Sequence, residues 1–413
     1  MTKLDQALNY LVIGAGGKFV GPGGNSPRRP GGGVVIPQFL FFRKPQGTAP
    51  VAGAGRLPAQ TQRQNVTNIV CLTLVLWASL AGAARAQTLY VDAVNGRPAG
   101  TGTPAAPLAS LEQAVALAQE FTGQEPVVLK LAPGLYTLTR PAEIRTRGLA
   151  PDTARYTVEA TVLPDDPAWQ PTKMPVIQSV SADGFTQPFA HAVGFLVARS
   201  NVRFSGLKFV GNAHPGVRNY YPINRKNEAY RGLTVAQCYF IGERNSAPIQ
   251  GAIWAHGAGG LRVDHTIFYN CKNALIFGQH STSGFSLTHS VIYGAYEAAI
   301  WFDPTEAKFT SFTFDHNVIT KCDYVWIRSA KTSANFAFRN SLIAGNAHYI
   351  GLDTDKGVVE NPENKHREQS IRKTGNVLLR EVKTEGLPRD YLNLVPQSAG
   401  YDLKAGLFEV PKP

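Results

Sequence analysis

The chain has 413 residues, 44% of them hydrophobic and 17% charged, so it is long enough for a large core or two domains. The net charge of +12 lies mainly in residues 1–86, which hold nine of the 41 Lys and Arg residues but one of the 29 Asp and Glu residues. The remainder has no basic helix or run of Lys and Arg, which argues against nucleic-acid binding. The 40 glycines, 21 Phe and 15 Tyr favour β-structure.

The N-terminal part has the composition of a disordered extension followed by a leader. Residues 1–62 are rich in Gly and Pro, and such a segment cannot bury enough apolar surface to fold. Residues 63–86 resemble a secretory signal peptide, because a twelve-residue apolar run is followed by the small-x-small sequence Ala-Arg-Ala. We therefore expect secretion to the periplasm or the exterior, cleavage between Ala86 and Gln87, and no membrane span afterwards. The alternative is an uncleaved signal anchor. Because signal peptides begin close to the initiator, translation is expected to start near Val66.

Residues 87–126 are expected to form an N-terminal cap with one strand and one short helix. Ser110 and Gln113 form a capping box, in which the serine side chain accepts from the backbone three residues later. Leu111, Val115 and Ala118 then line one face of the helix.

Residues 127–355 contain repeats, each with two short apolar runs. The first runs align without gaps as LTVAQCYFIGE (233–243), LRVDHTIFYNC (261–271), FSLTHSVIYGA (285–295), FTFDHNVITKC (312–322) and FAFRNSLIAGN (336–346). The second runs are AIWAH (252–256), ALIFG (274–278), AIWFD (299–303), YVWIR (324–328) and YIGLD (349–353). Leucine-rich repeats would need a Leu/Asn consensus that is missing here, and propeller blades need about 40 residues or more. The period of about 25 residues therefore predicts an all-β parallel solenoid of roughly 8–10 coils.

Two stretches identify a resemblance to a known family. YVDAVNGRPAGTGTPAAPLASLEQAVALA (90–118) and VVLKLAPGLYTL (127–138) resemble the cap and first coil of secreted right-handed parallel β-helix proteins, the pectin-lyase-like superfamily. The resemblance implies a right-handed parallel β-helix whose open end is covered by the capping helix. The tail, residues 386–408, is similar to the closing segment of such proteins, so residues 356–413 are expected to cover the last coil. The catalytic motifs of the superfamily are absent, so no residue role is carried over.

The second runs predict an outer surface suited to sugars. Strict alternation of side chains along each strand places Trp254, Ile276, Trp301, Trp326 and Gly351 on the outside. Indole rings stack on the apolar face of a pyranose, and polar groups bind its edge. The alternative is that another segment of the chain covers this surface.

Polar residues are expected beside these tryptophans. The next outward column is His256, Gly278, Asp303, Arg328 and Asp353, with His280 and Lys331 just beyond the strands. The segment 212–231 is expected to be a long insertion that either covers the surface or forms a groove wall with Tyr220, Tyr221 and Arg225.

These residues suggest an enzyme that acts on an extracellular polysaccharide. Arg328 or Lys331 is predicted to abstract the proton beside a uronate carboxylate, with Asp303 at the same site, and Ca²⁺ is an optional cofactor. The predicted substrate-binding residues are Trp254, Trp301, Trp326, His256, His280, Asp353, Tyr220 and Tyr221. Lyase-type β-elimination is favoured over hydrolysis, and the protein is expected to be a monomer. The alternatives are a carbohydrate-binding solenoid without activity and an adhesin that binds protein.

A second polar column runs through the first set of repeats, as Gln237, His265, His289, His316 and Asn340, with Asp264 and Asp315 beside it. The favoured interpretation is a structural ladder of side chains at the turns, and a metal site or a catalytic histidine is left open. Cys271 and Cys322 lie two coils apart, about 10 Å, which exceeds the reach of a disulfide. We therefore predict buried free thiols.

Overall fold

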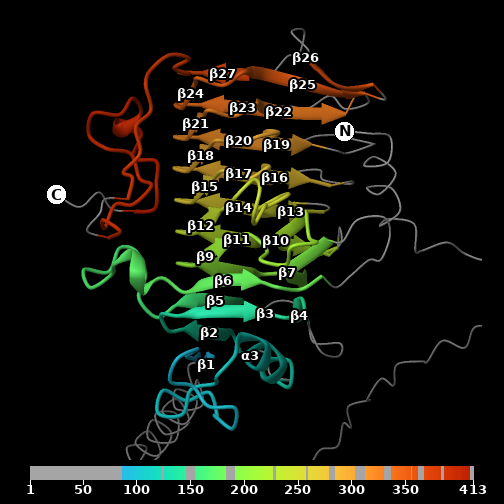
Figure 1. Cartoon of the computed structure of the whole chain (residues 1–413), viewed down its shortest axis with the longest axis vertical. Helices are drawn as coiled ribbons and strands as arrows, with labels where there is room; N and C mark the ends of the chain where they lie inside the picture. The colour runs from blue at the N-terminus through green and yellow to red at the C-terminus, as the bar shows by residue number, and fades with distance from the viewer. Residues whose placement is uncertain are drawn as a thin grey trace, which may run out of the picture. The chain divides into compact units, whose positions relative to one another are not determined.

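Three sheets, each built from one strand of every successive repeat, make up the described part of the chain (Figure 1). The computed structural model describes residues 86–121, 125–145, 154–182, 191–226, 229–256, 259–278, 284–302, 312–329, 336–354, 356–360, 367–382 and 386–409. They belong to one unit within residues 84–413. The predicted extension and nearly all of the signal peptide lie outside the described residues. In the described ranges, no helix has the length and apolar character needed to cross a membrane.

The three sheets are named here in the order in which the chain visits them in each coil. Sheet I contains β1 (Gln87–Val91), β2 (Val127–Leu131), β5 (Tyr156–Ala160), β8 (Val202–Ser205), β11 (Leu233–Ala236), β14 (Leu261–Asp264), β17 (Phe285–Thr288), β20 (Phe312–Asp315), β23 (Phe336–Arg339) and β27 (Arg367–Gln369). Sheet II contains β3 (Leu135–Leu138), β6 (Val176–Ser179), β9 (Lys208–Val210), β12 (Tyr239–Ile241), β15 (Ile267–Tyr269), β18 (Val291–Tyr293), β21 (Val318–Thr320) and β24 (Leu342–Ala344).

Sheet III contains β4 (Ala142–Arg145), β7 (His191–Ala198), β10 (Asn219–Arg225), β13 (Ile253–Ala255), β16 (Asn273–Phe277), β19 (Ala298–Phe302), β22 (Tyr324–Ser329), β25 (His348–Thr354) and β26 (Gly357–Glu360). The named strands pair in parallel, and β26 alone runs antiparallel to its neighbour, β25. Each strand pairs with its counterpart in the next coil, so the predicted parallel solenoid is confirmed.

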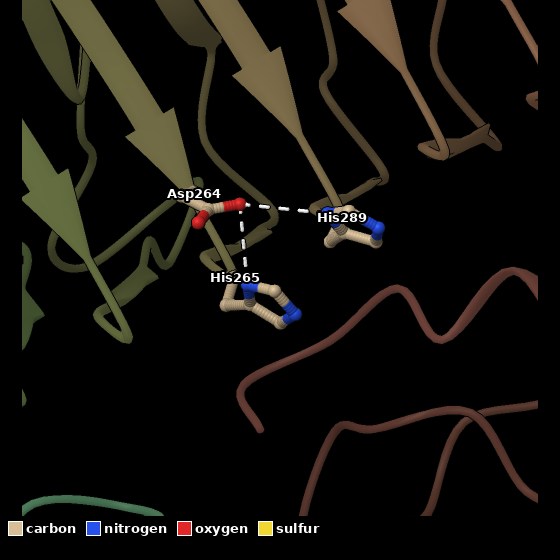
Figure 2. Close-up of side chains that lie close together, drawn as sticks. All are labelled: Asp264, His265 and His289. Atoms are coloured by element: carbon tan, nitrogen blue, oxygen red, sulfur yellow. Dashed lines mark ion pairs between the residues drawn. The ribbon is translucent and has the colours of Figure 1, made fainter. Parts of the chain in front are cut away.

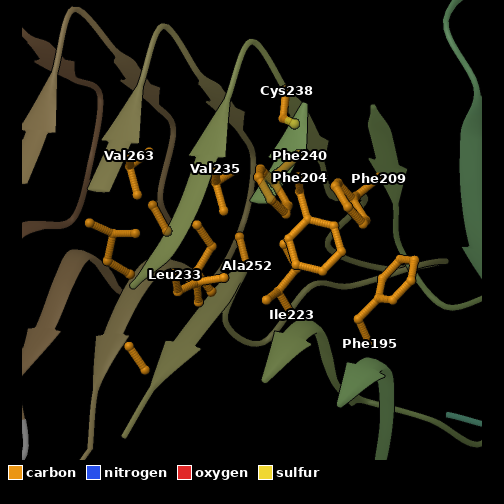
Figure 3. Packing of buried hydrophobic residues seen from close by; sticks show 14 of the residues in the cluster. Phe195, Phe204, Phe209, Ile223, Leu233, Val235, Cys238, Phe240, Ala252 and Val263 are labelled. Carbon is orange, nitrogen blue, oxygen red and sulfur yellow. The ribbon is translucent and has the colours of Figure 1, made fainter. Parts of the chain in front are cut away.

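The core is the interior of this solenoid, where apolar side chains of all three sheets meet (Figure 3). The inward residues repeat from coil to coil, so identical rings stack on one another. Phe209 and Phe240 have centroids 4.7 Å apart, and Phe240 and Phe268 have centroids 5.1 Å apart, with nearly parallel rings in both pairs. This stacking continues the core without a break along the solenoid axis.

The N-terminal cap forms as predicted. Ser110 accepts a hydrogen bond from the Gln113 backbone at 3.1 Å and begins α3 (Leu111–Ala118), whose apolar face is buried. The strand of the cap, β1, pairs with β2 in parallel, so sheet I begins within the cap. At the other end, β27 adds a rung to sheet I beyond residue 355.

The described residues of the C-terminal segment, 372–382 and 386–408, lie along the outer side of sheet II (Figure 1), whereas the prediction had this segment cover the last coil. This segment includes a short 3₁₀ helix, η2 (Tyr401–Leu403), and a similar turn, η1 (Pro171–Lys173), occurs earlier in the chain. Its apolar side chains pack against outward residues of sheet II, namely Tyr239, Ile267, Val291, Val318 and Leu342. Apolar residues face outward from sheet II, and this apolar surface explains where the segment packs.

Candidate functional site

The strands of sheet III do not alternate strictly, and this changes which side chains reach the outside. In β19, Ala299 and Ile300 are consecutive, and both belong to the core, whereas Ala298 and Trp301 pack in a separate outer cluster. The same order of one outward, two inward and one outward residue recurs in β22, where Val325 and Trp326 are both in the core. Two consecutive residues therefore point inward in each of these strands. A strict alternation of inward and outward side chains does not describe them fully.

Trp326 was predicted to face outward, and that prediction is wrong. It pairs with Ile300, while Trp301 pairs with Ile327, and the Trp326 side chain is 1% exposed. The alignment of YVWIR with AIWFD was therefore shifted by one residue. A shift of one residue moves every side chain to the opposite face of a strand.

Trp301 faces outward as predicted, but it is covered. Only 6% of its surface is exposed, and it packs with Ala298, Ile327 and the partly buried Ile276, Tyr324 and Val358. The alternative of a covered outer surface therefore holds for Trp301. The predicted stripe of three solvent-facing tryptophans does not form.

Trp254 remains on the outer face and is half-buried. Its ring lies 4.6 Å from the Tyr221 ring and 4.5 Å from the His256 ring, measured between centroids, with tilts of 40° and 41°. A Cβ on Gly278 would come 2.5 Å from the His256 Nδ1 and 3.1 Å from the Trp254 Nε1, so bare backbone is needed there. We call Tyr221, Asn224, Trp254, His256 and Ile276 the Trp254 patch.

Segment 212–231 is not an insertion over this face, because it contains β10, a full strand of sheet III. Tyr220 is a core residue with no exposed surface, so it cannot form a groove wall. Tyr221 faces outward and is 8% exposed. Arg225 is also buried, where its Nε and Nη1 donate to the carbonyls of His256 and Gly259 at 2.8 and 2.9 Å, and burial lowers its pKa to about 10.

The predicted catalytic set is not assembled by the described residues. Asp303 and Lys331, like the predicted ligand His280, lie outside the described residues. Arg328 pairs with Phe302 and Leu352, which places it in an inward column at the end of β22, where partial burial lowers its pKa. Asp353 is half-buried on β25, four coils and about 19 Å along the axis from Trp254.

Sequence reasoning missed Glu297, which precedes β19 directly. One carboxylate oxygen accepts from Asn273 Nδ2 at 2.7 Å, and the other lies 3.5 Å from the Lys272 Nζ. Burial raises the pKa of Glu297, against the opposing effect of the Lys272 ammonium and of hydrogen bonds from Asn273 and Lys272. Its charge also acts on the pKa of Tyr221, which burial raises first and Glu297 raises further. The spacing of Lys272 and Glu297, one repeat apart, was the available signal.

Two amide oxygens on this face have no hydrogen-bond partner among the residues that the structure describes. Asn224 Oδ1 and Asn273 Oδ1 are both buried acceptors, on β10 and β16. Asn224 pairs with Trp254 in the register of the sheet, and Asn273 holds Glu297. Buried acceptors are normally satisfied, and an ordered water is the donor that could reach atoms as buried as these.

The column of histidines is a ladder at the turns between sheets I and II (Figure 2). Gln237, His265, His289, His316 and Asn340 all have positive φ, between 44° and 55°. The His265 and His289 rings stack at 4.8 Å, and both Nδ1 atoms approach the Asp264 Oδ1, at 3.1 and 3.6 Å. The neighbouring column, Thr266, Ser290, Asn317 and Ser341, links successive coils by side-chain to backbone hydrogen bonds. These contacts support the structural interpretation.

The donor atoms of Asp264, His265 and His289 lie within 4.8 Å of one another, so they are the described set that could hold a metal ion. Burial acts to raise the pKa of Asp264, but hydrogen bonds from His265, His289 and Thr288 outweigh it and hold the pKa well below its usual range. The stacked rings and the hydrogen bonds to Asp264 make this cluster part of the ladder.

Comparison with known proteins fits this architecture. Residues 178–343 match the family model described as a right handed beta helix region. The fold is a right-handed parallel β-helix. The search of curated proteins gave no match.

Several solved structures resemble the β-helix distantly. A pectin methylesterase from Aspergillus niger is 12% identical, with 70% of this chain and 87% of that chain covered and a TM-score of 0.35. A rhamnogalacturonan lyase is 12% identical, covering 78% and 99%, with a TM-score of 0.36. Pectin methylesterase PemA from Erwinia chrysanthemi is 11% identical, covering 80% and 99%, with a TM-score of 0.32. Likeness at this level carries no argument about activity.

Proposed function

We propose that the β-helix binds a polysaccharide on the outer face of sheet III, at the Trp254 patch. The observation that carries the proposal is the half-buried indole of Trp254 between the rings of Tyr221 and His256. Such a surface presents an apolar platform flanked by the imidazole of His256 and the phenol ring of Tyr221, which suits the C–H face and the hydroxyl edge of a pyranose.

The extent of the Trp254 patch along the solenoid axis supports the same proposal. The parallel strands present equivalent positions at about 4.8 Å intervals along the axis. The Trp254 patch spans three successive strands, β10, β13 and β16, so it can contact more than one sugar unit, which favours a polymer over a single sugar.

The test is affinity electrophoresis of the full chain through gels that contain neutral, uronate or sulfated polysaccharides. The chain is expected to be retarded by at least one of them. The Trp254→Ala variant should lose the retardation that persists at high salt, while Tyr401→Ala, which removes an aromatic ring that is 49% exposed elsewhere, should keep it. Unchanged retardation of Trp254→Ala at high salt on every glycan that holds the wild type would refute the proposal.

A second candidate, cleavage of the bound polysaccharide, is favoured by Glu297. A carboxyl whose pKa is raised by burial suits proton transfer near neutral pH. The Glu297→Gln variant should keep its affinity for the glycan and lose product formation, followed as unsaturated-product absorbance for elimination or as reducing ends for hydrolysis. Activity that survives Glu297→Gln would exclude Glu297 as the proton-transfer group.

A further inference from the structure

A second concave surface lies on a different side of the β-helix, over sheet I. It has a volume of about 820 Å³ and is lined by residues of β2, β5, β8, β11 and β14 and the turns before them. The lining residues that matter here are Arg155, Arg203 and Arg262, with Thr157, Thr234 and Gly232. None of the residues that line this concavity has an aromatic side chain.

The register of sheet I places these residues in order. Thr157, Arg203, Thr234 and Arg262 pair one after another, so they form a single outward column on four successive strands. Arg203 and Arg262 are therefore two coils apart, about 10 Å along the axis. Thr234, which lies between them in the column, has a much smaller side chain than the two arginines that flank it.

Gly232 keeps the edge of the concavity open. Its φ of +71° is strained for any residue with a side chain, and a Cβ there would come 2.6 Å from the Asn201 Oδ1. The fold therefore requires a glycine at this turn. The absence of a side chain at Gly232 leaves free space beside Thr234.

The charge of the concavity is not neutralised by the described residues. Arg155 and Arg262 are exposed, and Arg203 is half-buried with a long hydrogen bond of 3.4 Å from its Nη2 to the Ser205 Oγ. The nearby carboxylates in the adjacent outward column are engaged elsewhere. Glu159 pairs with Lys130 at 2.8 Å, and Asp264 pairs with His265.

We propose that this concavity is a second binding site, for an anionic polysaccharide whose carboxylate or sulfate groups contact Arg203 and Arg262. Guanidinium groups bind carboxylate and sulfate oxygens through paired hydrogen bonds, and repetition at a fixed interval suits a repeating chain. The hydroxyl of Thr234, which lies between the two arginines, then faces the sugar between two acidic groups. Single-stranded nucleic acid is disfavoured, because such sites combine basic groups with aromatic rings for base stacking.

The test measures binding of the full chain to a polyuronate, a sulfated glycan, a neutral glycan and single-stranded DNA of matched charge density. The wild type should bind at least one anionic glycan more tightly than the neutral glycan, with an affinity that falls as salt rises. Arg203→Ala/Arg262→Ala should weaken that binding about tenfold or more. Arg339→Ala, an exposed arginine on β23 of the same sheet, should bind like the wild type.

Several results would overturn the proposal. They are an absence of binding to either anionic glycan, equal binding by the double variant and the wild type, or tighter binding of DNA than of both glycans. If the double variant does not fold, Arg262→Ala alone gives the answer, because its side chain is exposed. The two sites are separable, since Trp254→Ala should leave salt-sensitive binding intact. Loss of one site with survival of the other shows which proposal has failed.

Discussion

Trp326 lies directly opposite Ile300 in the parallel pair of β19 and β22, and its indole is buried in the core. Replacement by alanine removes a large buried ring and leaves a cavity. We expect Trp326→Ala to lower the free energy of unfolding by about 3–5 kcal/mol, measured by urea denaturation. Trp254→Ala should cost distinctly less, because Trp254 is only half-buried. Equal costs for the two variants would mean that Trp326 is not a core residue.

Asp264 should make the stability of the β-helix dependent on pH. Its folded-state pKa is depressed, so its contribution is present above the unfolded value of about 3.9 and is lost as the pH falls through the folded value. We expect Asp264→Asn to be about 1 kcal/mol less stable than the wild type at pH 7, after allowance for solvent screening. The difference should close below about pH 4.

Asp402→Asn is the matched control for Asp264→Asn. Asp402 pairs with Arg372 at 3.0 Å, but its side chain is 69% exposed. Exposed pairs contribute little, so the melting curves of this variant should follow the wild type at all pH values. A gap for Asp264→Asn that stays constant between pH 7 and pH 3 would contradict the assignment.

Arg389 should anchor the C-terminal segment. Its guanidinium donates to the carbonyls of Asp166, Pro167 and Trp169 at 2.8–3.0 Å. Arg389→Ala leaves these acceptors without that donor, so we expect a loss of about 2–3 kcal/mol and faster proteolysis of residues 372–408. Arg389→Lys keeps the positive charge but lacks the several N–H donors of the guanidinium group. It should therefore restore only part of the protection from proteolysis. Unchanged proteolysis of Arg389→Ala would show that the segment is held without it.

The three described cysteines should be inert in the folded protein. Cys238, Cys271 and Cys322 are free and buried, as predicted for Cys271 and Cys322, and burial raises the pKa of Cys238 and of Cys322 to about 12. Because the thiolate is the reactive form, a thiol reagent at pH 8 should label none of them before denaturation. After denaturation all three should react. Rapid labelling of the folded chain would indicate that the core opens.

The fold could be predicted because the solenoid repeats its pattern. Each coil places apolar residues at equivalent positions, so the runs starting at Leu261, Phe285 and Phe312 align by inspection and pair as expected. The error at Trp326 arose in a turn. Tyr293 and Ala298 are five residues apart, whereas Thr320 and Tyr324 are four apart, which shifts the second run. Val325, Trp326 and Ile327 are all apolar, so hydrophobicity cannot choose between the two registers.

The site was predictable only where local alternation holds. Trp254 and His256 are brought together beside Tyr221, while Trp301 is covered by residues from β16, β22 and β26 that no local pattern links to it. Glu297 could not be predicted from its own strand, because the contacts that hold its carboxylate come from Asn273 and Lys272 in the preceding coil. Contacts between coils depend on the register, which one sequence defines only approximately.

The C-terminal segment has a consequence for how the molecule unfolds. Solenoid coils touch only their neighbours, so such arrays can fray from either end, one rung at a time. Here Tyr239 donates to the Tyr391 carbonyl at 2.6 Å, Gly406 donates to the His289 carbonyl at 2.9 Å, and Arg389 reaches back to Trp169. These ties bridge early, middle and late coils. Rungs that would otherwise melt separately are thereby coupled into one all-or-none transition.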